Sequence, residues 1–501
     1  MLLGIDISTT SAKAILIDPV GRVLATSSHS YPLSTPKPLW SEQKPEDWWQ
    51  AAKASIRKVI RQTDTKPIDI KAIGLTGQMH GLVLLDSQNQ VLRPAILWND
   101  QRTADACELM VQKIGLEKLI SITGNPAMTG FTAPKLLWVR ENEPEIYRQI
   151  THILLPKDYI RFKLSGAFAI DCAEASGTSL FDITQRQWSQ EILELLDINP
   201  DWLPEVYEGT QITGEVSSQG AVETGLSPRT PIVGGGGDQA AQAVGVGAVT
   251  PGIVALTLGT SGVVFAPTSQ PLIDPQGRLH AMCHSLPPGD DQGWHLMGVM
   301  LSAGGSLRWF RDTFAPDSDY DLLLSSAEKI SPGSAGLLFM PYLTGERTPY
   351  PDPFARGGFI GLTIRHGFDH MTRSVLEGVA FGLRDSLSLL KESGLSEISQ
   401  VRISGGGAKS PLWQQIMADV MNVEMTTVNT TEGACYGAAL LAGVGAGVWG
   451  SVKDACSTSV KTLTATQPNS ANVSVYDDYY QTYHTLYPLL KDTFKSLATQ
   501  S

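Results

Sequence analysis

The segment with the most evident chemistry is a run of four glycines followed by an acid, residues 234–238. The apolar residues before it predict the end of a buried strand, and the alanine-rich residues after it predict a helix. Glycines lack a Cβ atom and let a ligand approach the backbone closely. The loop therefore presents the carboxylate of Asp238 where a helix begins. That carboxylate can act as a general base, or it can simply cap the helix, since Asp is a favoured N-cap residue.

A second acid stands close to the N-terminus. Asp6 is the only acid in the apolar residues 2–7 and precedes a turn rich in hydroxyl groups. A carboxylate in this place can hold a magnesium ion, directly or through water. The polar side chains that follow can meet phosphate oxygens. They are Thr9, Thr10, Ser11 and Lys13. The plainer interpretation is a hairpin turn whose side chains bond to one another.

Three further glycine-containing loops could hold an anion or a nucleotide against the backbone. The residues of interest in them are Gly259 with Thr260, Gly304, and Gly406 with Gly407 and Ala408. The first is a turn between two apolar segments, and the last lies between a predicted strand and a predicted helix. The loop of Gly304 is the weakest candidate, because it fits a packing feature equally well. The chain has no GxxxxGK[ST] motif, which excludes a P-loop enzyme.

The elements that must position these loops recur in the same order in both halves of the chain. A strand, a polar turn and a second strand at residues 2–17 are echoed at residues 252–265. A strand with glycine after it, at residues 68–77, is echoed at residues 398–407. A loop and alanine-rich helix close both halves. Strands alternating with helices predict a largely parallel, covered sheet in each half. We expect two α/β domains with a cleft between them, where small ligands bind. Their predicted bounds are 1–249 and 250–501.

Composition narrows the class of protein further. The 501 residues are 42% hydrophobic and 18% charged, as in an ordinary globular protein. The net charge of −12 argues against a nucleic-acid partner. Five scattered cysteines without a CxxC motif predict neither a disulfide framework nor a zinc site. No signal peptide is visible, and the apolar runs are too short to span a membrane. We expect a cytoplasmic protein without a membrane partner. The oligomeric state stays open, with a homodimer as one option.

Several motifs together resemble the FGGY carbohydrate kinases. Residues 130–138 are similar to the first signature of that family, and residues 357–377 are similar to its second. Within the family the chain most resembles the xylulokinases. The segments that carry this closer resemblance are residues 38–43, 77–81, 92–100, 154–159 and 345–349. The resemblance covers essentially the whole chain. It implies two ribonuclease-H-like domains of the actin and sugar-kinase ATPase fold around a central cleft.

The resemblance also implies roles for individual residues. Asp238 would be the general base, and Asp6 would be needed for activity near the metal and the phosphates. The remaining assignments divide between the two substrates. The sugar would be bound by Met79, His80, Asp238 and Gln239, and Gln239 stands where xylulokinases have Asn. The nucleotide would be bound by Thr9, Thr10, Ser11, Lys13, Gly259, Thr260, Gly304, Gly406, Gly407 and Ala408. No matching motif covers Arg308, which receives no role.

The activity that the resemblance implies is transfer of the γ-phosphoryl group of ATP to D-xylulose, with Mg²⁺ as cofactor. The product would be D-xylulose 5-phosphate. Two alternatives remain open. One is a kinase of the same family for D-ribulose or another polyol. The other is an actin-like ATPase in which the nucleotide drives partner binding. An acid placed to meet a sugar hydroxyl favours a kinase.

Overall fold

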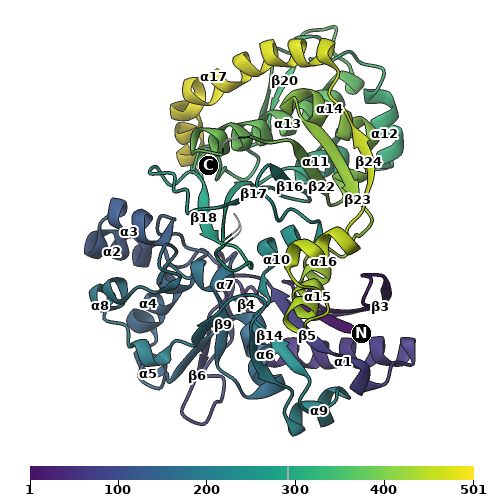
Figure 1. The fold of residues 1–501 in the computed structure, drawn as a ribbon. Helices are drawn as coiled ribbons and strands as arrows, with labels where there is room; N and C mark the ends of the chain where they lie inside the picture. Colours follow the sequence, from purple (N-terminus) through teal and green to yellow (C-terminus); the bar gives the residue numbers. More distant parts are fainter. Residues whose placement is uncertain (290–292, 396, 501) are drawn as a thin grey trace.

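The chain folds around two seven-stranded sheets, one formed mainly from each half of the sequence (Figure 1). The computed structural model describes residues 1–289, 293–395 and 397–500. The first sheet has the order β13 (Ile212–Glu215), β14 (Pro231–Val233), β5 (Ala72–Gly77), β1 (Leu2–Ile7), β2 (Ser11–Ile17) and β3 (Val23–Ser30). The short strand β15 (Gly236–Gly237) also pairs with β5. The second sheet has the order β18 (His280–Cys283), β19 (Trp294–Met300), β17 (Gly262–Thr268), β16 (Ile253–Leu258), β22 (Gln400–Ser404), β23 (Glu424–Val428) and β24 (Thr462–Thr466).

The two sheets share one topology. In the first, β1, β2 and β3 form an antiparallel meander, and β5 and then β14 join β1 in parallel. In the second, β16, β17 and β19 form the meander, and β22 and then β23 join in parallel. The predicted repeat is therefore confirmed. The central strands β1 and β16 are buried on both faces, which is why they read as nearly continuous apolar runs.

Long helices cover both sheets. Helix α1 (Pro45–Thr63) packs Trp48, Trp49 and Ile56 against the first sheet. The second sheet is covered by α13 (Phe368–Glu392) and α14 (Pro411–Met421), and α17 (Ser470–Gln500) packs on these two helices from outside. In the described residues, no helix is both long enough and apolar enough to pass through a membrane. Further helices are α2 (Ala104–Ile114), α3 (Leu116–Thr123), α4 (Thr132–Asn142), α6 (Pro156–Ser165), α8 (Gln190–Leu196), α9 (Ser218–Thr224), α11 (Gly304–Phe314) and α12 (Tyr320–Ala327).

The chain returns to the first sheet late in its sequence. Helices α15 (Gly433–Gly445) and α16 (Val452–Ser459) pack with residues of β1 and β2 in one apolar cluster, and Figure 1 shows both among the N-terminal strands. Helix α15 also lies against α10 (Asp238–Gly245), its counterpart in the repeat. A Cβ atom on Gly437 would lie 1.8 Å from the carbonyl oxygen of Ala241. The two equivalent helices thus meet backbone to backbone, and the chain does not divide at a single point.

Candidate active site

Three strand ends bring the two predicted acids to one edge of the first sheet. Strands β1, β5 and β15 run parallel, with Asp6 beside Thr76 and Thr76 beside Gly236. Asp238 comes directly after β15, and Met79 and His80 follow β5. The carboxyl ends of parallel strands are where ligands bind in open α/β sheets. The residues predicted to meet the sugar and the metal therefore share one edge.

Asp238 is half-buried and is the first residue of α10. The N-cap of this helix is Gly237, and no side chain caps it, so the capping interpretation is wrong. Burial and, to a lesser extent, the charge of Asp6 raise the pKa of Asp238 to about 7. Hydrogen bonds from Gln239 act in the opposite direction, and its Nε2 lies 3.4 Å from Oδ1 of Asp238. A carboxylate with a pKa near neutrality suits a general base.

Asp6 has an unsatisfied carboxylate oxygen. Its Oδ1 is buried without a hydrogen-bond partner in the part of the chain that the structure describes. Burial raises the pKa of Asp6 to about 6, and the charge of Lys13 partly offsets this. An orphaned, buried carboxylate oxygen fits a cation. The described residues contain no cluster of three or more side chains able to hold a metal. Mg²⁺ commonly needs only one or two carboxylates, with water and phosphate oxygens completing its shell.

Lys13 does not project freely from the hairpin. Its ammonium forms a 3.0 Å ion pair with Glu432, the residue before α15. Burial alone would lower the pKa of Lys13, but this pair raises it above its ordinary value. In this structure Lys13 ties β2 to the helix that returns from the second half, and its contact with phosphate stays a prediction.

The turn between β1 and β2 is held from within, as its plainer interpretation requires. The hydroxyl of Ser8 accepts hydrogen bonds from the backbone amides of Thr10 (3.3 Å) and Ser11 (3.1 Å). Thr9 bonds outside the turn instead: its Oγ1 accepts from Nε1 of Trp98 at 2.9 Å and donates to Oε1 of Gln78 at 3.3 Å. Thr10 is exposed. The turn is therefore rigid, and its side chains do not all face one way.

His80 is fixed in one neutral form. Its backbone has a left-handed φ of 69°, and its Nδ1 lies 2.6 Å from the carbonyl oxygen of Gly177. Because a carbonyl can only accept, Nδ1 carries the proton and Nε2 is left as an acceptor. Burial, with a smaller contribution from the charge of Lys135, lowers the pKa of His80 to about 3. The ring stacks on Phe131, with centroids 4.2 Å apart. His80 can thus accept a hydrogen bond from a sugar hydroxyl.

Residues 130–138, the first signature segment, hold the backbone of His80 in place. Nζ of Lys135 donates to the carbonyl oxygen of His80 at 2.8 Å and to that of Gly130 at 2.6 Å. The hydroxyl of Thr132 donates to the same oxygen of His80 at 3.1 Å. Met79 packs with Phe131 and lies so close to the glycine loop that a Cβ on residue 237 would be 2.8 Å from its sulfur. A side chain at position 237 would therefore displace Met79.

A buried charge network that the motif analysis missed holds the glycine loop. Arg161 donates to the carbonyl oxygens of Val233 (2.7 Å) and Gly234 (2.6 Å). Lys157 bridges Asp158 and Asp171 at 2.5 and 2.6 Å. The four charged side chains of this network are fully buried. The sequence did contain one indication of this network: Lys157 and Asp158 are two adjacent charges inside the otherwise apolar, xylulokinase-like segment 154–159.

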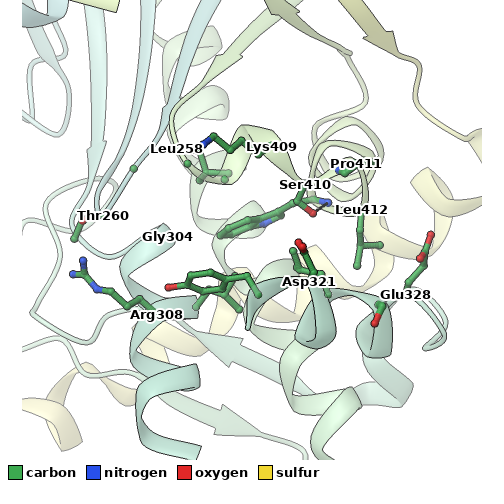
Figure 2. Close-up of a pocket in the computed structure, with 18 residues that line it drawn as sticks. Leu258, Thr260, Gly304, Arg308, Asp321, Glu328, Lys409, Ser410, Pro411 and Leu412 are labelled. Carbon is green, nitrogen blue, oxygen red and sulfur yellow. Dashed lines mark hydrogen bonds between the residues drawn. The ribbon is translucent and has the colours of Figure 1, made fainter. Parts of the chain in front are cut away.

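The second half carries a pocket of about 800 Å³ at the matching edge of its sheet (Figure 2). Five residues predicted to bind nucleotide line it: Gly259, Thr260, Gly304, Gly406 and Gly407. The turn and α11 are joined directly, because the amide of Gly304 donates to the carbonyl oxygen of Gly259 at 2.8 Å. A Cβ on Gly304 would lie 2.4 Å from that oxygen. The loop of Gly304, the weakest sequence candidate, is thus part of the pocket.

Other lining residues emerge only from the fold. Helix α11 contributes Arg308, and α12 contributes Tyr320 and Asp321, with Glu328 directly after it. The start of α14 contributes Ser410 and Trp413. Figure 2 shows Arg308 at the end of the pocket near Thr260 and Glu328 at the opposite end. Ala408 is buried and does not line the pocket; its carbonyl oxygen accepts from Nε2 of Gln414 at 2.7 Å. A cavity with apolar walls, backbone groups and a few polar side chains suits a nucleotide.

Comparison with known proteins gives the chain its family. Residues 1–245 match the N-terminal domain of the FGGY family of carbohydrate kinases, and residues 254–446 match its C-terminal domain. A xylulose kinase of Escherichia coli is 44% identical over 425 residues, which are 85% of this chain and 86% of the relative. A xylulose kinase of Bacillus subtilis is 39% identical over 98% of this chain and 97% of the relative.

A solved structure agrees with these relatives. The ligand-bound xylulose kinase of Lactobacillus acidophilus superimposes with a TM-score of 0.93 at 28% sequence identity, covering 99% of both chains. The family models together match most of the sequence; the first seven-stranded sheet lies within them, and so does the second apart from β24 and the first residue of β16. This chain belongs to the FGGY family of carbohydrate kinases.

Proposed function

We propose that this enzyme transfers the γ-phosphoryl group of ATP to the 5-hydroxyl of D-xylulose, giving D-xylulose 5-phosphate and ADP. The xylulose kinases to which the chain is 39–44% identical support this sugar. The observation that carries the reaction is Asp238, a carboxylate that caps no helix and faces the edge shared with Asp6. Membership of a carbohydrate kinase family leaves no place for the actin-like alternative, in which the nucleotide drives partner binding.

Asp238 is proposed as the general base. An alcohol is too weak an acid to be ionised by a carboxylate beforehand, so Asp238 orients the hydroxyl and accepts its proton as the new P–O bond forms. This suits the loose transition state of phosphoryl transfer, in which positioning and charge neutralisation dominate. Gln239 orients the carboxylate through its Nε2. His80 presents Nε2 as an acceptor for another sugar hydroxyl.

The nucleotide is proposed to lie in the pocket of the second half, with its phosphates toward Gly259 and Thr260. Asp6 would hold Mg²⁺, since its Oδ1 is buried and unsatisfied. The ion, when bound, would neutralise charge on the phosphates. We also infer a cytoplasmic enzyme. The five unpaired cysteines, four of them buried, support a reducing compartment.

The proposal is tested by a substrate screen. The purified protein is given ATP and Mg²⁺ with D-xylulose, D-ribulose or glycerol, and ADP release is measured. We expect D-xylulose to give the highest kcat/KM, and NMR of the product to place the phosphate on C5. A higher kcat/KM for D-ribulose or glycerol would refute the sugar assignment. ADP release that no sugar accelerates would refute the kinase itself.

A further inference from the structure

The segment at residues 345–349 has no role in the site described so far, although it resembles xylulokinases. It lies in the second half, between β20 (Leu338–Met340) and β21 (Gly358–Ile360). Its backbone is tied to the second sheet, because the amide of Thr348 donates to the carbonyl oxygen of Val299 at 3.0 Å. The hydroxyl of Thr348 donates to the carbonyl oxygen of Arg278 at 2.9 Å. The backbone beside Arg347 is therefore fixed to β19 and to Arg278, which lies two residues before the start of β18.

The guanidinium of Arg347 lacks a partner. No hydrogen bond or ion pair joins it to any residue in the described ranges, and the side chain is mostly buried. The neighbouring carboxyl does not neutralise it: Glu346 accepts from the backbone amides of Arg347 (2.7 Å) and Leu301 (2.9 Å). Burial raises the pKa of Glu346 to about 8, which favours its neutral form. Buried charges are normally paired. An unpaired guanidinium therefore indicates a missing oxygen-rich ligand.

His280 offers a second unsatisfied group beside Arg347. Its Nδ1 lies 2.7 Å from Oδ1 of Asn125, whose amide nitrogen donates to the carbonyl oxygens of Thr123 and Ala281. The oxygen of Asn125 is thus the acceptor, Nδ1 of His280 carries the proton, and Nε2 is an acceptor. That Nε2 is buried and has no partner among the described residues. One donor group and one acceptor are left open side by side.

These groups converge on the sugar residues of the first half. The ring of Phe131 lies between the two imidazoles, with its centroid 4.2 Å from that of His80 and 6.1 Å from that of His280. Burial lowers the pKa of both imidazoles, and the charge of Arg347 is close enough to lower both further. His280 from one half therefore lies beside Phe131 and close to His80 from the other, and the charge of Arg347 is near both imidazoles.

We propose that Arg347 and His280 form the end of the sugar pocket remote from Asp238. This inference rests on the proposed function, in which Asp238 meets the 5-hydroxyl of an open-chain ketose. The other end of that sugar carries a carbonyl and a hydroxyl. The guanidinium fork donates to the oxygens of this end, and Nε2 of His280 accepts from its hydroxyl. Arg347 is then a substrate-binding residue that selects for sugars whose far end, away from the reacting hydroxyl, carries a carbonyl and a hydroxyl.

The test compares Arg347→Met and Arg347→Lys with the unaltered enzyme. Arg365→Met is the matched control, because it removes the same charge from an exposed position in the same half. Binding of D-xylulose and of ATP is measured by calorimetry on each preparation, with kcat/KM for D-xylulose and for glycerol. Glycerol keeps the reacting end and lacks the carbonyl end. ATP affinity and the unfolding temperature report on folding of each variant.

We expect Arg347→Met to weaken D-xylulose binding by about ten-fold or more, because a charge-assisted hydrogen bond is lost. Arg347→Lys should bind with intermediate affinity, since it keeps the charge without the fork. ATP affinity and kcat/KM for glycerol should stay within about two-fold of the unaltered enzyme. Unchanged D-xylulose affinity in a folded Arg347→Met variant would overturn the inference, as would an equal loss with glycerol. An unaltered enzyme that does not phosphorylate D-xylulose would instead refute the proposed function.

Discussion

Asp238 owes its basicity to neighbours that act in opposite directions. Burial and the charge of Asp6 raise its pKa, while hydrogen bonds from Gln239 favour the charged form and lower it. The result is a pKa of about 7, at which the carboxylate can both accept a proton and release it near neutral pH. Gln239 thus acts on the base itself, in addition to its expected contact with the sugar.

This balance predicts the pH dependence of the reaction. Only ionised Asp238 can accept a proton, so kcat/KM for D-xylulose should fall as the pH drops below about 7. Gln239→Leu removes a hydrogen bond to the charged form. The pKa of Asp238 should rise, and the acidic limb of the pH profile should move to higher pH. Gln190→Leu, which loses a bond to the exposed Glu194, is the control and should leave the limb in place. A limb that stays fixed or moves to lower pH in Gln239→Leu would contradict this account.

At the scale of residues, the sequence indicated where candidate site residues lie along the chain better than it indicated which residues they contact. Asp6, Met79, His80 and Asp238, which were singled out from strand ends and glycine turns, lie at one edge of the first sheet. Lys13 was expected at the phosphates, yet it pairs with Glu432, 419 residues further along the chain. No local pattern encodes a partner so distant. The unpaired guanidinium of Arg347 became visible only when its surroundings were known.

At the scale of elements, the contact between α10 and α15 is the feature on which the site depends most. Helix α10 begins with Asp238, and glycines on both helices permit the close approach. A Cβ on Gly245 would lie 2.0 Å from the carbonyl oxygen of Gly433, much as one on Gly437 would strike Ala241. Any side chain at these positions forces the helices apart and moves the helix that carries the base.

Gly437→Ala should therefore lower both stability and turnover. Its methyl group would overlap the carbonyl oxygen of Ala241. We expect a loss of about 1–3 kcal/mol in the free energy of unfolding, measured with urea, and a lower kcat. Gly358→Ala is the matched control, because its Cβ meets no atom within 4 Å and its backbone is ordinary. A Gly437→Ala variant as stable and as active as the unaltered enzyme would show that this interface tolerates expansion.

The repeat of elements was readable from the sequence, but the return of the chain was not. Both meanders and both parallel additions follow the predicted order. The strand expected from residue 68 begins instead at Ala72, since Pro67 starts a single 3₁₀ turn through Asp69. The helix α15 was predicted as an element, yet its packing on the first sheet was not. An apolar helix face indicates that the helix packs against another element, but it does not identify which sheet that element belongs to.

At the scale of the whole molecule, the two halves hold different parts of the proposed reaction. The first sheet presents the proposed base and sugar-binding residues, and the second carries the proposed nucleotide pocket. They are joined near the site, because Nε2 of Gln242 on α10 donates to Oγ of Ser404 at 3.1 Å. Ser404 ends the strand that precedes the Gly406 loop. The base and the nucleotide loop are thus linked through one hydrogen bond between helix and strand.

This division of labour makes Asp238→Asn the most direct test of the account. The amide keeps the size of the side chain but cannot accept the proton. We measure kcat with D-xylulose, ATP affinity by calorimetry and the unfolding temperature on one preparation. Asp105→Asn, the same change in the first turn of α2, is the control. We predict that kcat falls by at least about 10²-fold while ATP affinity stays within about two-fold, since ATP binds to the other half. A folded Asp238→Asn variant with near-normal kcat would contradict the assignment of Asp238 as the base.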